Sequence, residues 1–468
     1  MRFGFVTLRL DSRSVGCELS IKFSTDFISD LRLWSRYWLK YIASTPGQLV
    51  AAALLISLWS DEQCLAGIWI TAFLIIIVAV NYYFARFLGA YAVVLAAFEI
   101  AVVLGLLILS AVLAFRSGSA WQQGIVLWGD TGAFGKSYGG AAWLGKLSAI
   151  CVTLPSATFA YLGSEMIGMT ILQTPDPRRT TARAIRMTSY RIVAFNIVCI
   201  ILVVMLIPCG LVHLDKDEQE PKTSLSAFVM AIRMAGIPVL PHILNACILV
   251  FALSAATFGL YLSTGTMYRM SNQKTAPTCL SITDRRGIPI LALLLCSALA
   301  TLAYLSVSRD SKVVFRYFVN LVSMFSILTW ISILVTHLSF ERARRAQKVP
   351  DAVLAFKAPL GRFGSWIALV SCIAMSLMRI IGVLGHFATH FGTHYKGFIT
   401  SYLGVPLYLA LLLGYKATTK CKRVDPEETS LFSDHTIVDA PDPGSPDVEI
   451  ALNRHKSRAK RLVRRWVV

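Results

Sequence analysis

Three ionisable residues lie within long apolar runs of the chain: Glu99, Glu165 and Arg379. A charged side chain in the hydrocarbon of a membrane costs a few kcal/mol unless it faces a cavity or a partner. Such groups are therefore candidates for ion pairing and for proton transfer. Two interpretations of Glu99 stay open, a protonated structural carboxyl and a proton-coupling group. Arg379 is a possible partner for Glu99, or it extends its guanidinium group to the membrane surface.

Glu165 follows a stretch that is poorly suited to a continuous helix. Pro155, Gly163 and several small residues precede it and weaken helical hydrogen bonding in mid-span. An unwound segment near the middle of a membrane offers free backbone N–H and C=O groups and the dipole ends of two half-helices. That combination suits a zwitterion with one carboxylate and one ammonium group. The alternative is a packing face rich in small residues, with Glu165 buried against a partner.

Motifs of hydrolytic and ATP-driven proteins are absent from the sequence. It contains no H-E-x-x-H, no G-x-x-x-x-G-K-[ST] and no G-x-S-x-G. The ten cysteines are scattered and form no C-x-x-C pair. His386, His390 and His394 would share a helix face, but Gly385 and Gly392 favour a turn there. We therefore expect no enzyme activity, no cofactor and no metal site, and any active transport would be driven by a gradient.

Membrane-spanning helices are the elements that must position these residues. Hydrophobic residues make up 56% of the 468, charged residues only 15%, and the mean hydropathy is +0.62. Apolar runs of about twenty residues, the length that crosses a hydrocarbon core of roughly 30 Å as a helix, recur along the chain. We expect an all-α integral membrane protein with about ten transmembrane helices, at 42–60, 66–86, 91–115, 148–172, 188–210, 242–268, 288–307, 317–339, 363–386 and 397–415.

The distribution of basic residues predicts the orientation in the membrane. The net charge is +19, and 34 of the 45 Lys and Arg residues lie in alternate segments that begin with 1–41 and end with 416–468. Because basic segments stay in the cytoplasm, both termini are expected there. The positive charge is therefore explained by the orientation of the chain in the membrane and does not indicate binding to nucleic acid. The expected partner is the lipid bilayer. We expect a cytoplasmic segment at 1–41, a transmembrane domain at 42–415, and a partly disordered cytoplasmic tail at 416–468 that is basic at its end.

Several motifs in a fixed order along the chain carry a family resemblance. Residues 159–165 read Phe-Ala-Tyr-Leu-Gly-Ser-Glu, and Asp-Pro-Arg-Arg-Thr follows at 176–180. Asp-Arg-Arg-Gly-Ile-Pro comes next at 284–289, then Ser-Met-Phe-Ser-Ile-Leu-Thr-Trp at 323–330 and Phe-Lys-Ala-Pro-Leu-Gly at 356–361. From about Trp34 to Lys422 the chain strongly resembles the fungal amino-acid permeases of the amino acid–polyamine–organocation superfamily.

The resemblance implies a fold and a set of site residues. Members of that family usually have twelve helices, contain two inverted repeats of five helices in a LeuT-like arrangement, and import amino acids with protons. By this likeness Phe159, Ala160, Tyr161 and Gly163 would form an unwound substrate site. Thr257 and Ser323 match pore-facing stretches more loosely. Glu165 and Glu99 would be proton-coupling or structural charges.

The sequence departs from the family pattern in several places. No Gly-rich first-helix motif is found, residues 1–33 match nothing, and the ten expected spans align with the third to twelfth family helices. The first two helices are therefore expected to be missing. Gln48 stands where Pro-x-Glu is usual, Glu99 where the fifth helix generally has lysine, and Gly265 where Ser-Arg-Thr is common.

The expected function is secondary active transport of an amino acid, with proton-coupled import, by a multi-pass protein of a fungal plasma membrane. Its expected partners are the amino-acid substrate, protons and lipid, and no oligomeric state is predicted. The alternative, motivated by the absent first-helix motif, is an amino-acid sensor or defective permease paralogue that does not transport.

Overall fold

The fold of the protein was analysed in a computed structural model. It describes residues 30–56, 59, 66–116, 150–163 without 152, 155 and 156, 177–206, 239–272, 276–307, 311–348, 360–389 and 403–410. Every regular element within these ranges is a helix. Seven of the described helices are long and apolar enough to cross a membrane, which agrees with an all-α integral membrane protein.

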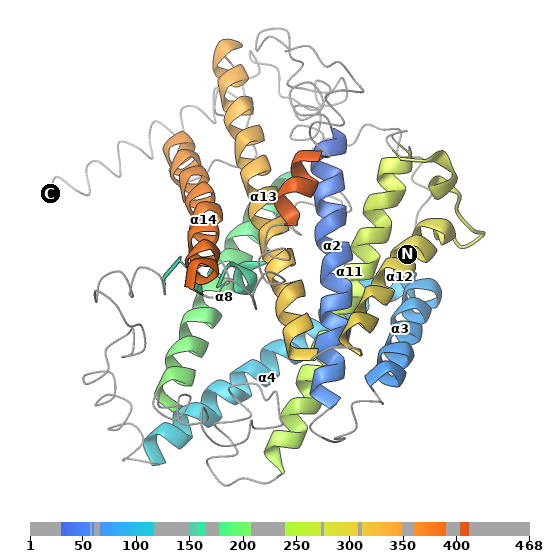
Figure 1. The fold of residues 1–468 in the computed structure, drawn as a ribbon, viewed down its shortest axis with the longest axis vertical. Helices are drawn as coiled ribbons and strands as arrows, with labels where there is room; N and C mark the ends of the chain where they lie inside the picture. Colours follow the sequence, from blue (N-terminus) through green and yellow to red (C-terminus); the bar gives the residue numbers. More distant parts are fainter. Residues whose placement is uncertain are drawn as a thin grey trace, which may run out of the picture.

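The seven long helices are shown in Figure 1. They are α2 (Asp30–Ile56), α3 (Ala66–Tyr83), α4 (Leu88–Arg116), α8 (Pro177–Leu206), α11 (Leu240–Asn272), α13 (Ser311–Ala346) and α14 (Gly361–Thr389). The short helices are η2 (Ala85–Phe87), η3 (Thr158–Tyr161), η5 (Thr278–Ser281), α12 (Ile290–Ala300) and η6 (Thr301–Ser306).

Most long helices extend beyond the apolar windows that predicted them. α2 begins twelve positions before the expected residue 42, and α13 runs past residue 339 to Ala346. Helical hydrogen bonding continues into polar residues that project from the hydrocarbon, so an apolar window underestimates helix length. The expected span 288–307 is a shorter apolar helix, α12 continued by η6. The expected spans 148–172 and 397–415 lie largely outside the described residues.

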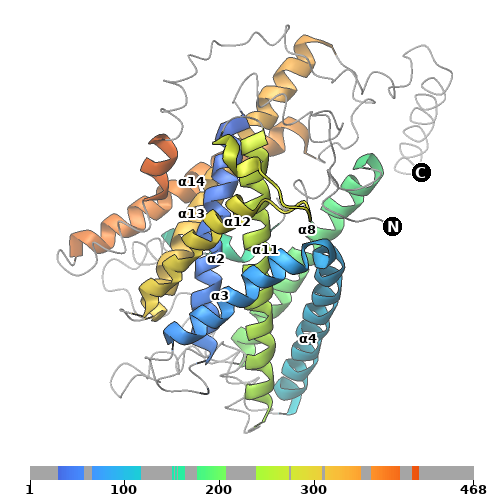
Figure 2. The ribbon, with the colours of Figure 1, turned by 90° about the vertical axis from the view of Figure 1, so that its right-hand side faces the viewer.

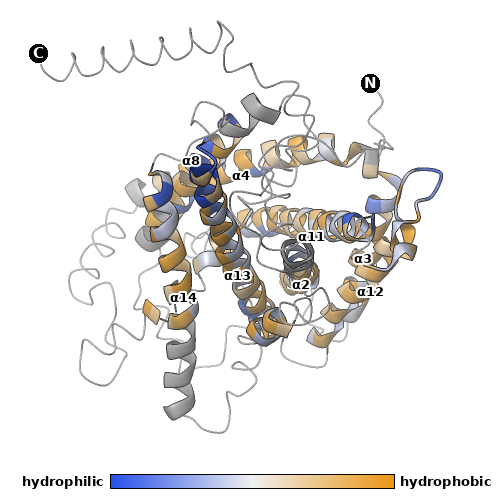
Figure 3. Cartoon of the chain, turned by 90° about the horizontal axis from the view of Figure 1, so that it is seen from above, coloured by the Kyte–Doolittle hydropathy of each residue, from blue (hydrophilic) through white to orange (hydrophobic). Residues whose placement is uncertain are grey.

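The central element of the described fold is α2. Figures 1 and 2 show it running between α11 and α13, and in Figure 3, which looks along it, α3 and α12 also lie beside it. Its side chains Leu49, Val50 and Ala52 are fully buried. Few residues of the spanning segments of α4 and α8 are buried in the described fold, and the rest are partly or fully exposed. Their apolar surface is suited to lipid, which replaces protein as the neighbour of outer helices.

Glycine allows α2 to approach its two main neighbours closely. A Cβ atom placed on Gly259 of α11 would lie 2.9 Å from the Thr45 Oγ1 atom of α2. A Cβ atom placed on Gly47 of α2 would lie 3.0 Å from the Cβ atom of Phe318 on α13. Small residues at helix contacts let backbones approach where no hydrophobic effect drives association. Gly47 and Gly259 therefore set the spacing of the three helices.

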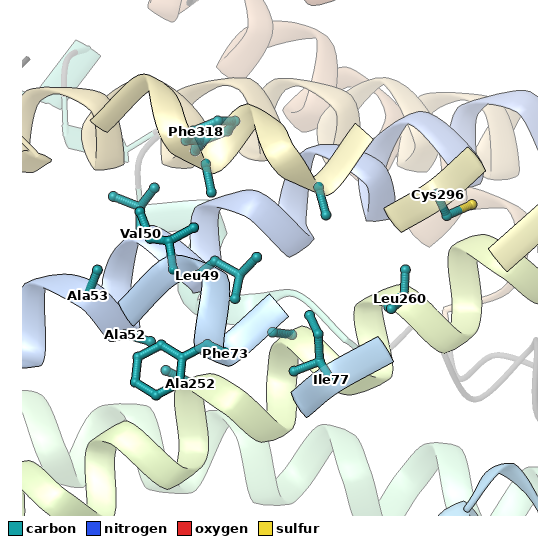
Figure 4. Close-up of a cluster of buried hydrophobic side chains, with 14 of the residues drawn as sticks. Leu49, Val50, Ala52, Ala53, Phe73, Ile77, Ala252, Leu260, Cys296 and Phe318 are labelled. Carbon is teal, nitrogen blue, oxygen red and sulfur yellow. The ribbon is translucent and has the colours of Figure 1, made fainter. Parts of the chain in front are cut away.

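An apolar cluster fills the contacts around α2 (Figure 4). Leu49 and Val50 pack with Phe318 of α13 in this cluster, and Phe73 and Ile77 join it from α3. Side chains at three- and four-residue intervals on one helix share a face, which explains why 49, 50 and 53 reach the cluster together. The cluster holds α2, α3, α11, α12 and α13 in one unit.

Two buried asparagine side chains add polar contacts between neighbouring helices to this apolar packing. The Asn81 Nδ2 atom of α3 donates to the carbonyl of Thr257 on α11 at 3.2 Å and to the carbonyl of Ile77 at 2.8 Å. The Asn245 Nδ2 atom of α11 donates to the carbonyl of Leu55 on α2 at 2.8 Å. Each bond satisfies a polar group that would otherwise be buried without a partner.

Candidate functional site

The segment expected to bind substrate does not continue as an α-helix. Phe159, Ala160 and Tyr161 belong to the short helix η3, and Leu162 after it is extended, with φ −68° and ψ 150°. Gly163 has a φ of 109°, a backbone conformation that side chains with a Cβ rarely adopt. The carbonyl of Ala160 accepts a hydrogen bond from Asn196 Nδ2 of α8 at 3.3 Å. The carbonyl of Ala160 therefore bonds to a side chain of another helix, and the backbone of this segment departs from a regular α-helix.

This segment lies against α2 and α13. Phe159 and Leu162 pack against Ala43 of α2 and against Val322 and Phe325 of α13. Ser323, another expected site residue, is fully buried between the last two positions. The structure thus brings Phe159 and Ser323 to the same contact region of α13.

Thr257 lies elsewhere, at the contact between α11 and α3. Its hydroxyl donates to the carbonyl of Leu253 at 2.8 Å, and its own carbonyl accepts from Asn81. The hydroxyl of Ser323 similarly donates to the carbonyl of Val319 at 2.7 Å. Both hydroxyls bond within their own helix, as Ser and Thr commonly do in apolar surroundings. Glu165, the remaining expected site residue on this stretch, lies outside the described residues.

A cavity of about 830 Å³ lies between α2, α4, α11 and α13. Sites for small molecules typically measure about 300–1,000 Å³, so it can hold an amino acid. Each helix contributes residues spaced three or four apart, which is one helix face. The lining residues are Gln48, Ala51, Leu54 and Leu55 from α2, Glu99 and Val103 from α4, Ile248, Phe251, Ala252 and Ala255 from α11, and Lys312, Phe315, Arg316 and Val319 from α13.

The cavity walls are held by direct contacts between α4 and α11. The rings of Phe98 and Phe251 meet edge to face, with their centroids 5.7 Å apart. Leu244 of α11 is buried against Val102 and Leu106 of α4. Figures 1 and 2 show α4 beside the end of α11 where that helix begins. Because α2 ends and α13 begins on this side as well, the cavity belongs to one half of the helix assembly.

Charged groups make this cavity chemically distinct. Glu99 lines it together with Lys312 and Arg316, and Gln48 is the remaining polar side chain in the lining. Arg191 of α8 also lies close enough to act electrostatically on Glu99. Glu99, singled out from sequence, thus lines a cavity. The side chain of Arg379, its expected alternative partner, lies outside the described ones.

Lys312 and Arg316 were not expected to be site residues. In the sequence both precede the expected span at 317–339, in the short connection that follows the expected span at 288–307. α13 in fact begins at Ser311, which places both residues on a helix, four positions apart and on one face. That spacing was visible in the sequence, but the helix start was not.

A second, much smaller cavity of about 10 Å³ adjoins the first. Gln48, Phe315 and Val319 line both cavities. Phe159 also lines the smaller one. The charged cavity and the irregular segment at 159–163 are therefore linked through a shared set of neighbouring side chains.

The described side chains include no group of three His, Cys, Asp or Glu residues placed to hold a metal ion. The side chains of His386, His390 and His394, weighed as a metal set in the sequence, are not among those described.

Comparison with known proteins was made for the whole chain. Residues 17–426 match the family model described as amino acid permease. The chain is 37% identical over 409 residues to the dicarboxylic amino acid permease of Saccharomyces cerevisiae, a match that covers 86% of this chain and 66% of that protein. An amino-acid permease of Schizosaccharomyces pombe is 30% identical over 390 residues, with 83% of this chain and 73% of the relative covered. The general amino-acid permease of S. cerevisiae is 27% identical, with coverages of 81% and 62%. The chain therefore matches about two thirds of the length of these relatives, all of which are named as permeases and not as enzymes.

Proposed function

Because the chain belongs to the amino acid permease family, we propose that it carries amino acids across a membrane by secondary active transport. The observation that carries this proposal is the cavity of about 830 Å³ that is lined by residues of four spanning helices, among them Glu99, Lys312 and Arg316. A transporter needs a site of this size among its helices, and ionisable groups inside a membrane mark substrate or ion pathways.

The irregular segment at 159–163 is the proposed site for the amino acid backbone. Phe159, Ala160 and Tyr161 lie in a short 3₁₀ turn, and Gly163 ends it with a positive φ. Backbone N–H and C=O groups outside a regular helix can bind the ammonium and carboxylate groups that all amino acids share. Ser323 lies on the adjoining face of α13 and is a further proposed contact. Thr257 of α11 is also a proposed site residue.

Proton coupling is proposed to run through Glu99, with Glu165 as a second candidate. Arg191 of α8 lies close enough to act electrostatically on Glu99, while Lys312 and Arg316 from α13 and Gln48 from α2 line the same cavity and the lining residues of α11 are apolar. An anionic ligand in this cavity would be repelled by an ionised Glu99. Proton binding at Glu99 and anion binding would therefore favour each other, which is the linkage that a symporter requires.

Acidic amino acids are the proposed substrates. The relative that is 37% identical to this chain is named a dicarboxylic amino acid permease. Other relatives are named for lysine and for proline, at 27% and 29% identity. Family membership alone therefore does not select a substrate, and the higher identity supports the acidic class.

The proposed location is the plasma membrane, with both termini in the cytoplasm. Lys and Arg residues concentrate in the segments that this orientation places inside. The proposed organisation is a cytoplasmic segment at 1–41, a transmembrane domain at 42–415 and a cytoplasmic tail at 416–468. Under this orientation the charged cavity lies in the outer half of the membrane.

Uptake of radiolabelled glutamate tests the proposal directly. The purified chain is reconstituted in liposomes with an alkaline interior, and uptake is compared with and without a protonophore. We expect accumulation that the protonophore abolishes, and Glu99→Gln should remove the dependence on the pH gradient. A folded, reconstituted chain that accumulates no amino acid would contradict transport. If that chain still binds glutamate and changes a nutrient-signalling readout in cells, the function is sensing.

A further inference from the structure

Helix α8 contacts both parts of the site that the proposed transport function uses. In the described fold it packs against α4, which carries Glu99 (Figures 1 and 3), and against η3 of the segment at 159–163. Arg191 of α8 lies close enough to act electrostatically on Glu99. Asn196 of the same helix donates from Nδ2 to the carbonyl of Ala160 at 3.3 Å. One helix therefore contacts the proposed proton site and the proposed substrate segment.

The two contacts of α8 lie on different sides of the helix. Arg191 and Asn196 are five positions apart, which corresponds to about 7.5 Å along an α-helix and about 140° around it. Arg191 can therefore face α4 while Asn196 faces η3. Because a helix moves as a rigid element over this distance, a movement of Arg191 relative to Glu99 also moves Asn196 relative to η3.

Packing around α8 is looser than packing around the central helix α2. In the described fold no residue of its spanning segment, Arg183–Ile201, is buried, whereas more than half of the apolar window of α13 is buried. Elements with few buried contacts change position at a low cost in free energy. A change in the attraction between Arg191 and Glu99 therefore moves α8 more easily than it moves α13.

Proton binding changes the charge that holds α8 to α4. Ionised Glu99 attracts the guanidinium group of Arg191, and exclusion of water strengthens this attraction. Protonated Glu99 is neutral and attracts Arg191 much less. The same cavity is also lined by Lys312 and Arg316 of α13 and by Gln48 of α2, whereas its α11 residues are apolar. η3 itself carries no charged residue, so it forms no ion pair that could respond to this proton directly.

We propose that α8 couples the proton site to the substrate segment, an inference that rests on the proposed transport function and deepens it. With Glu99 ionised, Arg191 holds α8 against α4. The amide of Asn196 then occupies the carbonyl of Ala160. With Glu99 protonated, α8 shifts, the bond from Asn196 is lost, and the carbonyl of Ala160 can accept a hydrogen bond from the ammonium group of an amino acid. Proton binding therefore raises the affinity for substrate, and by linkage substrate binding raises the affinity for the proton.

Hydrogen–deuterium exchange at a fixed pH tests this link without any substrate. Exchange of the backbone amides at 159–163 is measured in the purified chain and in three variants, Glu99→Gln, Arg191→Gln and Asn196→Ala. Each change should speed exchange in this segment about fivefold or more, because each interrupts one step of the link. Arg191→Lys keeps the charge and should retain the slower exchange. Arg183→Gln removes an exposed charge from the same helix, and as the matched control it should leave exchange unchanged.

The pH dependence of glutamate uptake tests the same link in the reconstituted chain. Without substitutions, the KM should rise about fivefold or more as the external pH rises and Glu99 loses its proton. Arg191→Gln and Asn196→Ala should each remove most of this dependence, and what remains is direct repulsion between ionised Glu99 and an anionic substrate. The double variant should resemble either single variant, because both changes interrupt one pathway. Arg191→Lys should restore the dependence.

Two results would overturn the inference. If Asn196→Ala alone speeds exchange, the bond to Ala160 is local and α8 transmits no signal. If Arg191→Gln leaves the pH dependence of the KM unaltered, Glu99 acts on substrate without α8. If the unaltered chain takes up no glutamate, the proposed transport fails, and the exchange measurement alone decides the link. Faster exchange in Glu99→Gln and Arg191→Gln would then support the link, and unchanged exchange would reject it.

Discussion

Gly259 on α11 lies so close to Thr45 on α2 that a Cβ atom at position 259 would meet the Thr45 Oγ1 atom at 2.9 Å. The Thr45 side chain is itself buried, and its hydroxyl donates to the carbonyl of Tyr41 at 3.0 Å. The hydroxyl is therefore held in place by its own helix and cannot move away cheaply. This contact sets the distance between the central helix and its main neighbour.

Gly259→Ala should destabilise the protein through this contact. The added methyl group forces α2 and α11 apart, and overpacking of this kind costs about 1–3 kcal/mol in the free energy of unfolding. Thermal unfolding in detergent measures the loss. Gly265→Ala on the same helix is the control, because a Cβ atom there meets nothing within 4 Å. Adding Thr45→Ala to Gly259→Ala should restore part of the stability, and a double variant no more stable than the single one would reject the steric explanation.

Asn81→Leu should weaken the contact between α3 and α11. Asn81 is buried and donates to the carbonyl of Thr257 at 3.2 Å, and leucine cannot replace that donor. Hydrogen bonds between membrane helices contribute about 0.6 kcal/mol on average and up to roughly 1.7 kcal/mol. Thermal unfolding should show a loss in this range. Asn81→Ala, which also lacks the donor, should lose at least as much, and an unaltered melting temperature in both variants would contradict the role of the bond.

Gly163→Ala should impair uptake more than it impairs stability. The φ of 109° is strained for alanine, and such strain costs roughly 1–3 kcal/mol. The segment can relieve the strain by changing its backbone, which would displace the groups proposed to bind substrate. Substrate affinity in the uptake assay is therefore the sensitive measurement. Gly105→Ala in α4, where a Cβ atom meets nothing within 4 Å, provides the comparison. Equal uptake by both variants would argue against a substrate role for 159–163.

The turn between α11 and α12 should depend on Arg286. Its guanidinium carbon lies 5.6 Å from the ring centroid of Tyr82 and 5.4 Å from that of Tyr83, at the end of α3. Cation–π contacts at exposed sites contribute about 0.5–1 kcal/mol. A double-mutant cycle with Arg286→Gln and Tyr83→Leu should give a coupling energy in that range from unfolding measurements. Arg285→Gln, which removes a charge in the same turn, should show no coupling to Tyr83→Leu, and equal coupling would indicate general electrostatics.

Apolar runs, breaks in them and the placement of basic residues were sufficient to predict the class of the protein. These signals are local, because a helix in a membrane must satisfy its own backbone groups and must be apolar along about twenty residues. Glu99 could be singled out for the same reason, since placing a carboxyl group within an apolar run costs free energy in a membrane. The motif that contains Phe159 and Gly163 likewise predicted an irregular backbone, because glycine and small residues within it disfavour a regular helix.

Tertiary structure decided which of these groups face one another. Lys312 and Arg316 precede the expected span at 317–339, and the start of α13 at Ser311 places them on one helix face. Only the packing of four helices places that face and Glu99 around one cavity. The hydrogen bond from Asn81 of α3 to the carbonyl of Thr257 on α11 likewise joins residues that are far apart in the chain. Sequence determines what each helix is, since that depends on neighbours in the chain. Which sides of the helices meet depends on close contacts such as Gly259 with Thr45, between residues that are far apart in the chain.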